Sequence, residues 1–127
     1  LDLRNTDEEA LRRAERAAFE FIDRTAEAEG VAVTRRALAR FAPVDFDPAM
    51  IALVEETARA QGLTVKRLPS GAGHDAQMFA PHCPTGMIFV PSRGGISHNV
   101  REFTEPSQMI AGANVLLEVV QKTARVD

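Results

Sequence analysis

Two of the three histidines in this chain follow glycine- and serine-rich turns, where a side chain can reach a ligand. His74 lies in "LPSGAGHDAQMF", and His98 lies in "GGISHNVREFT". The glycines of both turns let the backbone approach a ligand closely and adopt a positive φ. A neutral imidazole is a good ligand for zinc-like cations, and a carboxylate such as Glu102 can orient it through the second ring nitrogen. We therefore interpret one histidine as a metal ligand and the other as a substrate contact.

Each of these histidines also has a simpler interpretation. A lone histidine in a loop is more often a surface or capping residue than a ligand. A self-contained metal site made of the three histidines and Cys83 is disfavoured, because their spacings match no structural zinc pattern. His82 and Cys83 lie between Pro81 and Pro84, which is typical of an exposed connection. The chain also has no G-x-S-x-G elbow, P-loop or dinucleotide fingerprint.

The first element that would support these turns is a helix near the N-terminus. It begins at a capping box, in which Thr6 and Glu9 satisfy free amides of the first turn. Gly30 ends it, because glycine adopts the left-handed cap conformation easily. Its apolar stripe recurs at three- and four-residue steps and consists of Leu11, Ala14, Ala18, Phe21, Ile22 and Thr25.

Three further helices are predicted. Asp47 and Pro48 start the second one, as N-cap and first-turn residue, and Gly62 closes it. A short helix covers residues 75–80, directly after the first histidine turn. The last helix starts at Thr104 and Pro106, and its apolar stripe is Met109, Ala113, Leu116, Leu117 and Val120.

The segments between the helices are predicted as four strands, at residues 1–5, 31–41, 63–68 and 86–91. The last of them, "GMIFVP", is a continuous apolar run, which is typical of a strand covered on both faces. Alternation of strands and helices favours an α/β architecture with some parallel pairing. Ligands of such sheets bind beyond the carboxyl ends of the strands, so both histidine turns would reach the same rim.

Composition narrows the classes of function. The 127 residues are 45% hydrophobic and 26% charged, with a net charge of −3, which fits one globular domain or pieces of two. Without a basic cluster, Tyr or Trp the chain offers little to nucleic acid, and no apolar run is long enough to cross a membrane. The single cysteine fits the reducing cytoplasm. Because Leu1 begins the chain inside an expected strand, we expect a fragment, and a removed tag would explain this start equally well.

Three strings carry a resemblance to a known family: "SGAGHDAQMFA", "PTGMIFVPSRGGISHNVREFT" and "LDLRN". They resemble the C-terminal part of the dinuclear metal amidohydrolases, which include N-carbamoyl-L-amino acid hydrolase, allantoate amidohydrolase and β-ureidopropionase, on a zinc aminopeptidase/aminoacylase-like scaffold. The resemblance is most specific over residues 69–104. It implies an α/β fragment that joins part of a two-layer lid (dimerisation) domain, residues 1–42, to the C-terminal strands and helices of an α/β/α catalytic domain, residues 43–127.

The resemblance also implies roles for single residues. His98 matches the histidine that ligates one of two bridged divalent ions, zinc or manganese, and only this one metal ligand is expected here. His74 matches the catalytic histidine that contacts the substrate near the scissile group. Arg4 matches the arginine that pairs with the substrate carboxylate, a role that suits the planar guanidinium; otherwise it would be a solvated strand-end charge. Backbone amides of Ala72 and Gly73 are implied as further substrate contacts.

Two positions depart from the family's pattern. Val100 replaces a usual proline and Gly86 replaces a more common alanine. Neither change removes a reactive group, but both bear on how firmly the loop of His98 is braced. The family's other metal ligands and its general-base glutamate have no counterpart in this chain.

The resemblance implies that the full-length enzyme cleaves the carbamoyl or ureido C–N bond of a small-molecule substrate with a metal-activated hydroxide. It also implies a homodimer formed through the lid. A fragment with a single imidazole ligand would bind metal weakly and hydrolyse nothing. Two alternatives stay open: a metal-dependent peptidase or deacylase on the related scaffold, and an interaction domain that has lost catalysis.

Overall fold

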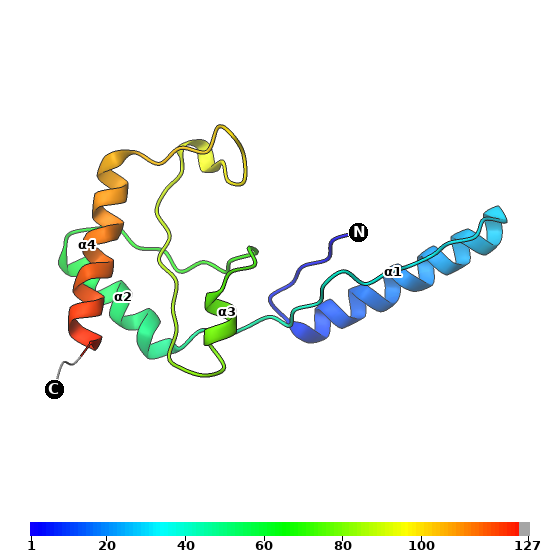
Figure 1. Cartoon of the computed structure of the whole chain (residues 1–127), viewed down its shortest axis with the longest axis horizontal. Coiled ribbons are helices and arrows are strands. Elements are labelled where there is room, and N and C mark those ends of the chain that lie inside the picture. Colours follow the sequence, from blue (N-terminus) through cyan, green and yellow to red (C-terminus); the bar gives the residue numbers. More distant parts are fainter. Residues whose placement is uncertain (125–127) are drawn as a thin grey trace. The chain divides into compact units, whose positions relative to one another are not determined.

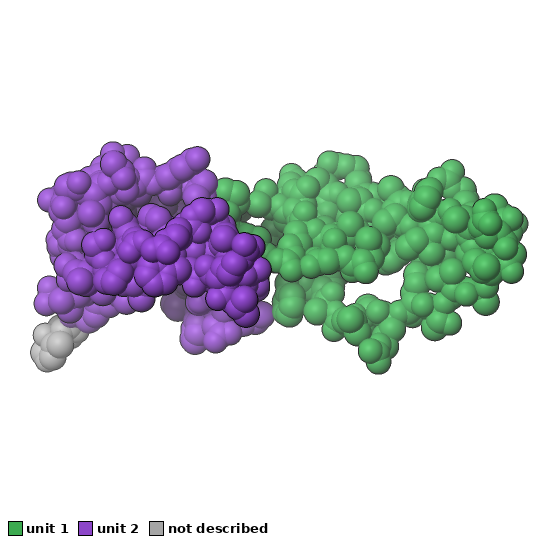
Figure 2. Space-filling view, turned by 90° about the horizontal axis from the view of Figure 1, so that it is seen from above, with its two compact units in different colours: residues 1–45, 69–73 green, residues 46–68, 74–127 purple. Residues whose placement is uncertain are grey.

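The structure, a computed structural model, describes residues 1–124 as two compact units. Unit 1 contains Leu1–Asp45 and Pro69–Gly73, and unit 2 contains Phe46–Leu68 and the described residues from His74 onward (Figure 2). No helix among the described residues combines the length and apolar character needed to span a bilayer. The elements in chain order are α1 (Glu8–Glu29), α2 (Pro48–Ala60), α3 (Ala76–Phe79), the 3₁₀ turn η1 (Arg93–Gly95) and α4 (Pro106–Thr123) (Figure 1).

Helix α1 of unit 1 is capped at both ends by its own sequence. The Asp7 carboxylate accepts a hydrogen bond from the Ala10 amide at 2.6 Å, so Asp7 is the N-cap. The predicted capping box at Thr6 and Glu9 is therefore wrong by one residue, since the carboxylate that follows Thr6 takes the role. Gly30 ends the helix with a φ of 65°, which confirms the predicted left-handed cap.

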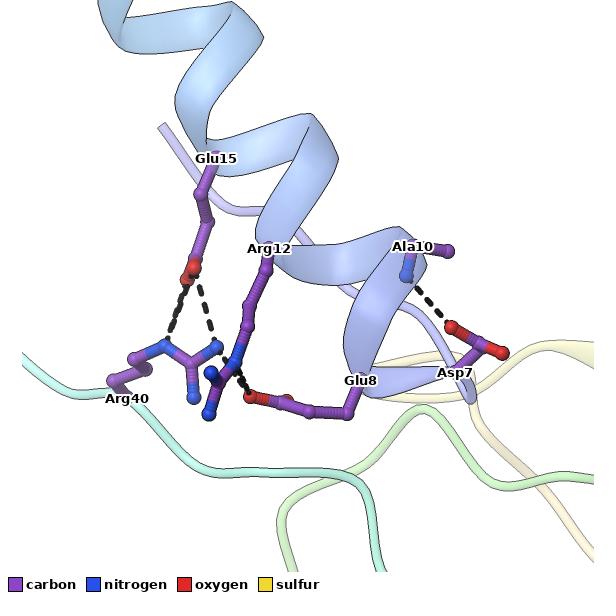
Figure 3. A network of polar contacts seen from close by, with 6 residues as sticks. All are labelled: Asp7, Glu8, Ala10, Arg12, Glu15 and Arg40. Atoms are coloured by element: carbon purple, nitrogen blue, oxygen red, sulfur yellow. Dashed lines mark hydrogen bonds and ion pairs between the residues drawn. The ribbon is translucent and has the colours of Figure 1, made fainter.

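An ion-pair network joins α1 to the segment of unit 1 that follows it (Figure 3). The Arg40 guanidinium donates to Glu8 at 2.8 Å and to Glu15 at 3.0 Å. Arg12 donates to the same oxygen of Glu8 at 2.6 Å. The hydrogen bond from Arg12, followed by that from Arg40, holds the pKa of Glu8 below its ordinary value of 4.5.

A second set of contacts fixes the direction of this segment. Arg35 pairs with Asp23, and its guanidinium lies 5.1 Å from the centre of the Phe19 ring. Arg40, further along the segment, pairs with Glu15, which is nearer the start of α1. The segment therefore runs antiparallel to α1, as Figure 1 also shows.

Helix α2 begins and ends in unit 2 as its sequence predicts. Pro48 is its first residue, and the Asp47 side chain accepts a hydrogen bond from the Met50 amide at 2.7 Å. Gly62, with a φ of 75°, donates to the Arg59 carbonyl at 2.9 Å just beyond the helix. Both ends follow from the conformations that proline and glycine favour.

The core of unit 2 lies where α2 packs against α4. Ala58 of α2 is buried against Val115 and Val119 of α4. Thr57 is fully buried, and its hydroxyl accepts a hydrogen bond from the Lys122 ammonium at 3.1 Å, which satisfies the polar group. The partly buried apolar residues around this core are Met50, Leu53, Val54, Leu63, Val65 and Ile88.

The predicted apolar stripe of α4 is wrong about which face is buried. Val115 and Val119 are 3% and 5% exposed, whereas Leu116 and Leu117 of the predicted stripe are 54% and 56% exposed. The helix carries apolar residues on more than one face, so the helical period alone does not decide which face meets α2. The helix also begins at Pro106 with Glu105 as its cap residue, one position after the expected Thr104.

The described residues contain no strand, so the predicted strands at residues 1–5, 31–41, 63–68 and 86–91 are wrong. A strand requires a hydrogen-bonded ladder with a neighbour, and none of these segments forms one with another described segment. Apolar composition such as that of "GMIFVP" favours a strand only where a partner is present. The described part of the chain is helical, and the predicted α/β sheet is not formed within it.

Candidate functional site

His74 lies two residues before the short helix α3, and its side chain binds the first amide of that helix. Its Nδ1 accepts a hydrogen bond from the Ala76 amide at 3.0 Å, and Gln77 Oε1 accepts one from the His74 amide at 3.2 Å. This reciprocal pair resembles a capping box, but the N-cap residue of the helix is Asp75 and the His74 side chain binds the amide two residues ahead, not three. The simpler interpretation of a loop histidine as a capping residue thus applies to Nδ1. The other ring nitrogen, Nε2, takes part in neither bond.

The guanidinium of Arg4 binds a carboxylate of its own unit. It donates to Asp2 through Nη2 at 2.7 Å and through Nε at 3.1 Å. Its third nitrogen, Nη1, donates to the Gly71 carbonyl, which belongs to the same unit. The hydrogen bond from Arg4 lowers the pKa of Asp2 from its ordinary value. The Arg4 guanidinium therefore binds a carboxylate in a bidentate manner. It is also hydrogen-bonded to the turn that carries Gly73.

Ala72 and Gly73, the two residues of that turn whose amides are predicted substrate contacts, differ in their local surroundings. The Ala72 amide donates to the Ser70 hydroxyl at 3.2 Å, so it already has a local partner. A Cβ placed on Gly73 would meet no heavy atom within 4 Å. The turn is thus open around Gly73, and the role of its amide as a substrate contact stays a prediction.

His98 has an unusual backbone conformation. Its φ is 53°, the one positive φ of a non-glycine residue among residues 1–124. Such a conformation costs about 1 kcal/mol or more and needs support from its surroundings. Glu102 provides it, because its carboxylate accepts a hydrogen bond from the His98 amide at 2.9 Å. The prediction that Glu102 orients a ring nitrogen is therefore wrong, since its contact is with the backbone.

The loop of His98 is braced at its base. The Arg93 amide donates to the Phe103 carbonyl at 2.7 Å, and the Arg93 guanidinium lies 4.4 Å from the centre of the Phe103 ring. The same guanidinium pairs with Glu105 at 2.6 Å. Val100, in contrast, is fully exposed. The base of this loop is therefore held by Arg93, whereas the Val100 side chain is exposed and does not pack against the loop.

Glycine is explained by backbone conformation at positions 94 and 95 of unit 2 and by packing at position 86. Gly94 and Gly95 have φ values of 65° and 68°, as a glycine-rich turn predicts. A Cβ on Gly86 would lie 3.0 Å from Cγ of Met50, so glycine at this position accommodates the Met50 side chain of α2. The departure from alanine at position 86 is thus a packing feature.

A cavity of about 460 Å³ in unit 2 has His74 among its lining residues. The rest of the lining is mostly apolar and includes Met87, Phe89 and Leu116. The polar side chains of the lining are those of His74, Thr85 and Thr123, so few side-chain hydrogen-bond donors are available there to a ureido or carboxylate group. The cavity is therefore mostly an apolar surface, on which His74 is one of few polar groups.

The described residues do not form a complete metal site. Among them, no group of three or more His, Cys, Asp or Glu residues is placed to hold a metal ion. A catalytic zinc ion takes about three protein ligands, so this part of the chain supplies too few. His82 and Cys83 are exposed, as predicted for a connection between two prolines. The ring of His98, which is also exposed, has the chemistry to supply one ligand.

Sequence reasoning missed three residues that act on the candidate residues. Gln77 follows His74 at the spacing of a capping box, and that spacing could have identified it. Asp2 precedes Arg4 by two positions, the alternation that places side chains on one side of an extended segment. Arg93 had no such signal, because its partners lie across the loop and not at a regular spacing.

Comparison with known proteins gives matches along nearly the whole chain. The family model of peptidase family M20/M25/M40 matches residues 6–122. An uncharacterized hydrolase of Haemophilus influenzae is 37% identical over 126 residues, which are 99% of this chain and 31% of the relative. An N-carbamoyl-L-amino-acid amidohydrolase of Paenarthrobacter aurescens is 36% identical, over 98% of this chain and 30% of its own length. An allantoate amidohydrolase of Bacillus subtilis is 42% identical over 67% of this chain and 21% of its own length.

Solved structures agree with these matches. A Burkholderia vietnamiensis amidase of the hydantoinase/carbamoylase family has a TM-score of 0.88 and 37% identity, covering 94% of this chain and 29% of that one. The corresponding amidase of Burkholderia multivorans has a TM-score of 0.83 and 38% identity, with the same coverage. The chain spans less than a third of the length of these relatives. Since the family model matches nearly all of it, the chain belongs to peptidase family M20/M25/M40.

Proposed function

We propose that this chain is part of a longer metal-dependent amidohydrolase that cleaves the carbamoyl or ureido C–N bond of N-carbamoyl amino acids or allantoate-like compounds. The observation that carries the proposal is the similarity to proteins named N-carbamoyl-L-amino-acid and allantoate amidohydrolases. The G-A-G-H-D and S-H-N strings, on which the similar chemistry would depend, both lie within the matched residues. The relatives are much longer than this chain, which supports the proposal that the chain supplies only part of the active site.

Arg4 is the proposed binding group for the substrate carboxylate. Its present contact with Asp2 uses two nitrogens on one carboxylate, the arrangement that a substrate carboxylate would require. The side chain is 62% exposed, so an exchange of Asp2 for a ligand needs no opening of a core. Gly73 would add a backbone contact from the same unit.

His98 is the proposed ligand for one of two divalent ions, zinc or manganese. Its ring is exposed, and the hydrogen bond that fixes the residue uses its amide, which leaves the imidazole for a metal. The ions, when bound, would activate the water that attacks the carbamoyl carbon and stabilise the developing negative charge. The remaining ligands and the general base would come from residues outside this chain.

We further propose that residues 1–42 belong to a lid domain, through which the enzyme forms a homodimer, and residues 43–127 to a catalytic domain. The change of unit after Asp45 supports a boundary near this position. Residues 69–73 of the glycine-rich turn belong to unit 1, so the chain returns to unit 1 before residue 69 and leaves it again after residue 73. A cytoplasmic location is proposed from the single, exposed cysteine.

A peptidase or deacylase is the second candidate, because the matching family is described as a peptidase family. The two functions differ in the bond that is cleaved. A panel of N-carbamoyl amino acids, allantoate, dipeptides and N-acyl amino acids, given to the longer enzyme with manganese or zinc, separates them. We expect turnover of carbamoyl or ureido substrates, whereas turnover of dipeptides or acyl amino acids alone would overturn the proposal.

The 127-residue chain by itself is the natural comparison in this assay. We expect it to show no hydrolysis with either metal, since the described residues hold no three-ligand group. Clear turnover by the chain alone would contradict the claim that the site is incomplete. A longer enzyme without any hydrolytic activity would instead support an interaction domain.

A further inference from the structure

The hydrogen bond at the His74 ring fixes where its proton lies. A backbone N–H can only donate, so the Nδ1 that receives the Ala76 amide at 3.0 Å must be an acceptor and carry no proton. In the neutral ring the proton is then on Nε2. The first amide of α3, that of Ala76, therefore selects one tautomer of the His74 side chain.

We propose that His74 is presented as a hydrogen-bond donor through Nε2–H, and that Gln77 is the positioning residue that maintains this state. The Gln77 side chain accepts the His74 amide at 3.2 Å, and the Gln77 amide donates to the His74 carbonyl at 2.9 Å. These contacts hold the backbone of His74 so that its ring reaches Ala76. The inference rests on the proposed function in one respect: the acceptor of Nε2–H is taken to be the substrate oxygen that gains negative charge.

The choice of histidine at this position supports a role beyond capping. Asparagine, aspartate and serine are the better helix caps, and each could accept the Ala76 amide. Asparagine also carries an amide nitrogen that can donate, but this nitrogen lies beside the acceptor oxygen, whereas histidine places its second nitrogen on the far side of the ring, where these shorter side chains do not reach. In His74, Nδ1 therefore accepts the Ala76 amide, while Nε2–H is a donor that takes no part in this hydrogen bond.

The tautomer also separates the roles of the two turn histidines. A nitrogen that carries a proton does not bind a metal, and Nδ1 of His74 is already engaged. In the state described, His74 is thus neither a metal ligand nor a general base. His98, whose structural contact uses only its amide, has no such restriction.

The tautomer can be measured directly in the 127-residue chain labelled with ¹⁵N-histidine, at a pH where the ring is neutral. The His74→Asn variant identifies which ring signals belong to His74. We expect Nδ1 to have the shift and coupling pattern of an unprotonated nitrogen and Nε2 those of a protonated one. We expect Gln77→Ala to give a mixture of tautomers and Gln77→Glu, which keeps an acceptor, to restore the single form. A ring with its proton on Nδ1 in the unmodified chain would overturn the inference.

Kinetics of the longer enzyme supply the second measurement. The His74→Asn variant keeps an acceptor for Ala76 but lacks Nε2–H, so we expect kcat to fall about 100- to 1000-fold with KM and thermal stability nearly unchanged. Gln77→Ala should lower kcat by a smaller factor, and Gln77→Glu should recover it. A His74→Asn enzyme with full kcat would also overturn the donor role.

The two measurements keep the inference distinct from the proposed function. The ring signals do not depend on which substrate is cleaved, so a failed substrate panel with the expected tautomer refutes only the function. Carbamoyl turnover together with the opposite tautomer refutes only the inference.

Discussion

Each candidate residue is held by a local contact that leaves a different chemical group available to a ligand. His74 uses Nδ1 for a helix cap and retains Nε2. His98 is held through its amide, and its ring takes no part in that bond. Arg4 is the exception, because its guanidinium is occupied by Asp2 and Gly71. Under the proposed function, a substrate carboxylate would therefore compete with Asp2 for Arg4, whereas a ligand of either histidine would displace no contact named above.

The contact between Glu102 and the His98 amide gives a testable prediction at this scale. The positive φ of His98 needs a compensating interaction, and the Glu102 carboxylate supplies one at 2.9 Å. We expect Glu102→Ala to let the loop relax and to weaken metal binding by the longer enzyme about 10- to 100-fold. Metal affinity measured by competition with a chelating dye would show this loss.

The matched variant is Glu102→Gln, which keeps an oxygen acceptor for the amide. It should bind metal nearly as well as the parent enzyme. If Glu102→Ala retains the parent's affinity, the carboxylate does not position His98. If the Gln variant is as weak as the Ala variant, the negative charge matters and not the hydrogen bond.

At the scale of elements, the sequence predicts helix ends better than it predicts packing. Proline, aspartate and glycine act through their own dihedral angles and short-range hydrogen bonds, so Asp47, Pro48 and Gly30 start and end helices as expected. Strands and buried faces depend on partners elsewhere in space. The segment "GMIFVP" has the composition of a strand but no ladder in the described residues. Likewise, α4 buries Val115 and not Leu116, because α2 decides the face.

The same limit applies to the candidate site. The histidines and Arg4 are recognisable by residue type and by the strings that contain them. The tautomer of His74 and the backbone contact of Glu102 depend on distances that only the folded turns define. The types of the candidate residues are therefore predictable from the sequence. The tautomer of His74 and the hydrogen-bond partner of Glu102 are not.

The ion pairs along α1, and between α1 and the segment that follows it, predict how stability depends on pH. Arg12 and then Arg40 lower the pKa of Glu8 below its ordinary value of 4.5. A carboxylate with a lowered pKa in the folded state stabilises that state above its unfolded pKa, and this contribution is lost as the pH falls through the folded value. We expect the free energy of unfolding to decrease below about pH 4.5. Urea unfolding at a series of pH values measures it.

The contribution of Glu8 is isolated by comparing two variants of α1. Glu8→Gln should remove part of the loss at low pH, whereas Glu20→Gln, at a position where the described contacts include no ion pair, should not. Because these side chains are exposed, about 1 M salt should reduce the difference between the variants. An unchanged pH profile in Glu8→Gln at low salt would show that the network does not stabilise the fold.

At the scale of the molecule, each unit leaves large apolar side chains exposed. Unit 1 exposes Phe21 of α1 at 62%, and unit 2 exposes Ile110 and Leu117 of α4 at 61% and 56%. Single exposed apolar residues are common on proteins, but several on one helix indicate a surface that another protein or domain covers. The predicted stripe of α4 is thus an apolar face that stays exposed in unit 2, whereas Val115 and Val119, outside the stripe, are buried.

These exposed faces predict that the 127-residue chain associates in solution. We expect light scattering to give a mass of at least a dimer, rising with protein concentration, because apolar surface is removed from water on contact. Phe21→Glu tests the face of unit 1, and Leu117→Glu tests the face of unit 2. In the longer enzyme, where the proposed dimer forms through residues 1–42, Phe21→Glu should weaken the dimer more than Leu117→Glu does. A monomer at all concentrations would contradict association of the chain, and a stronger effect of Leu117→Glu on the longer enzyme's dimer would place that interface on α4 instead.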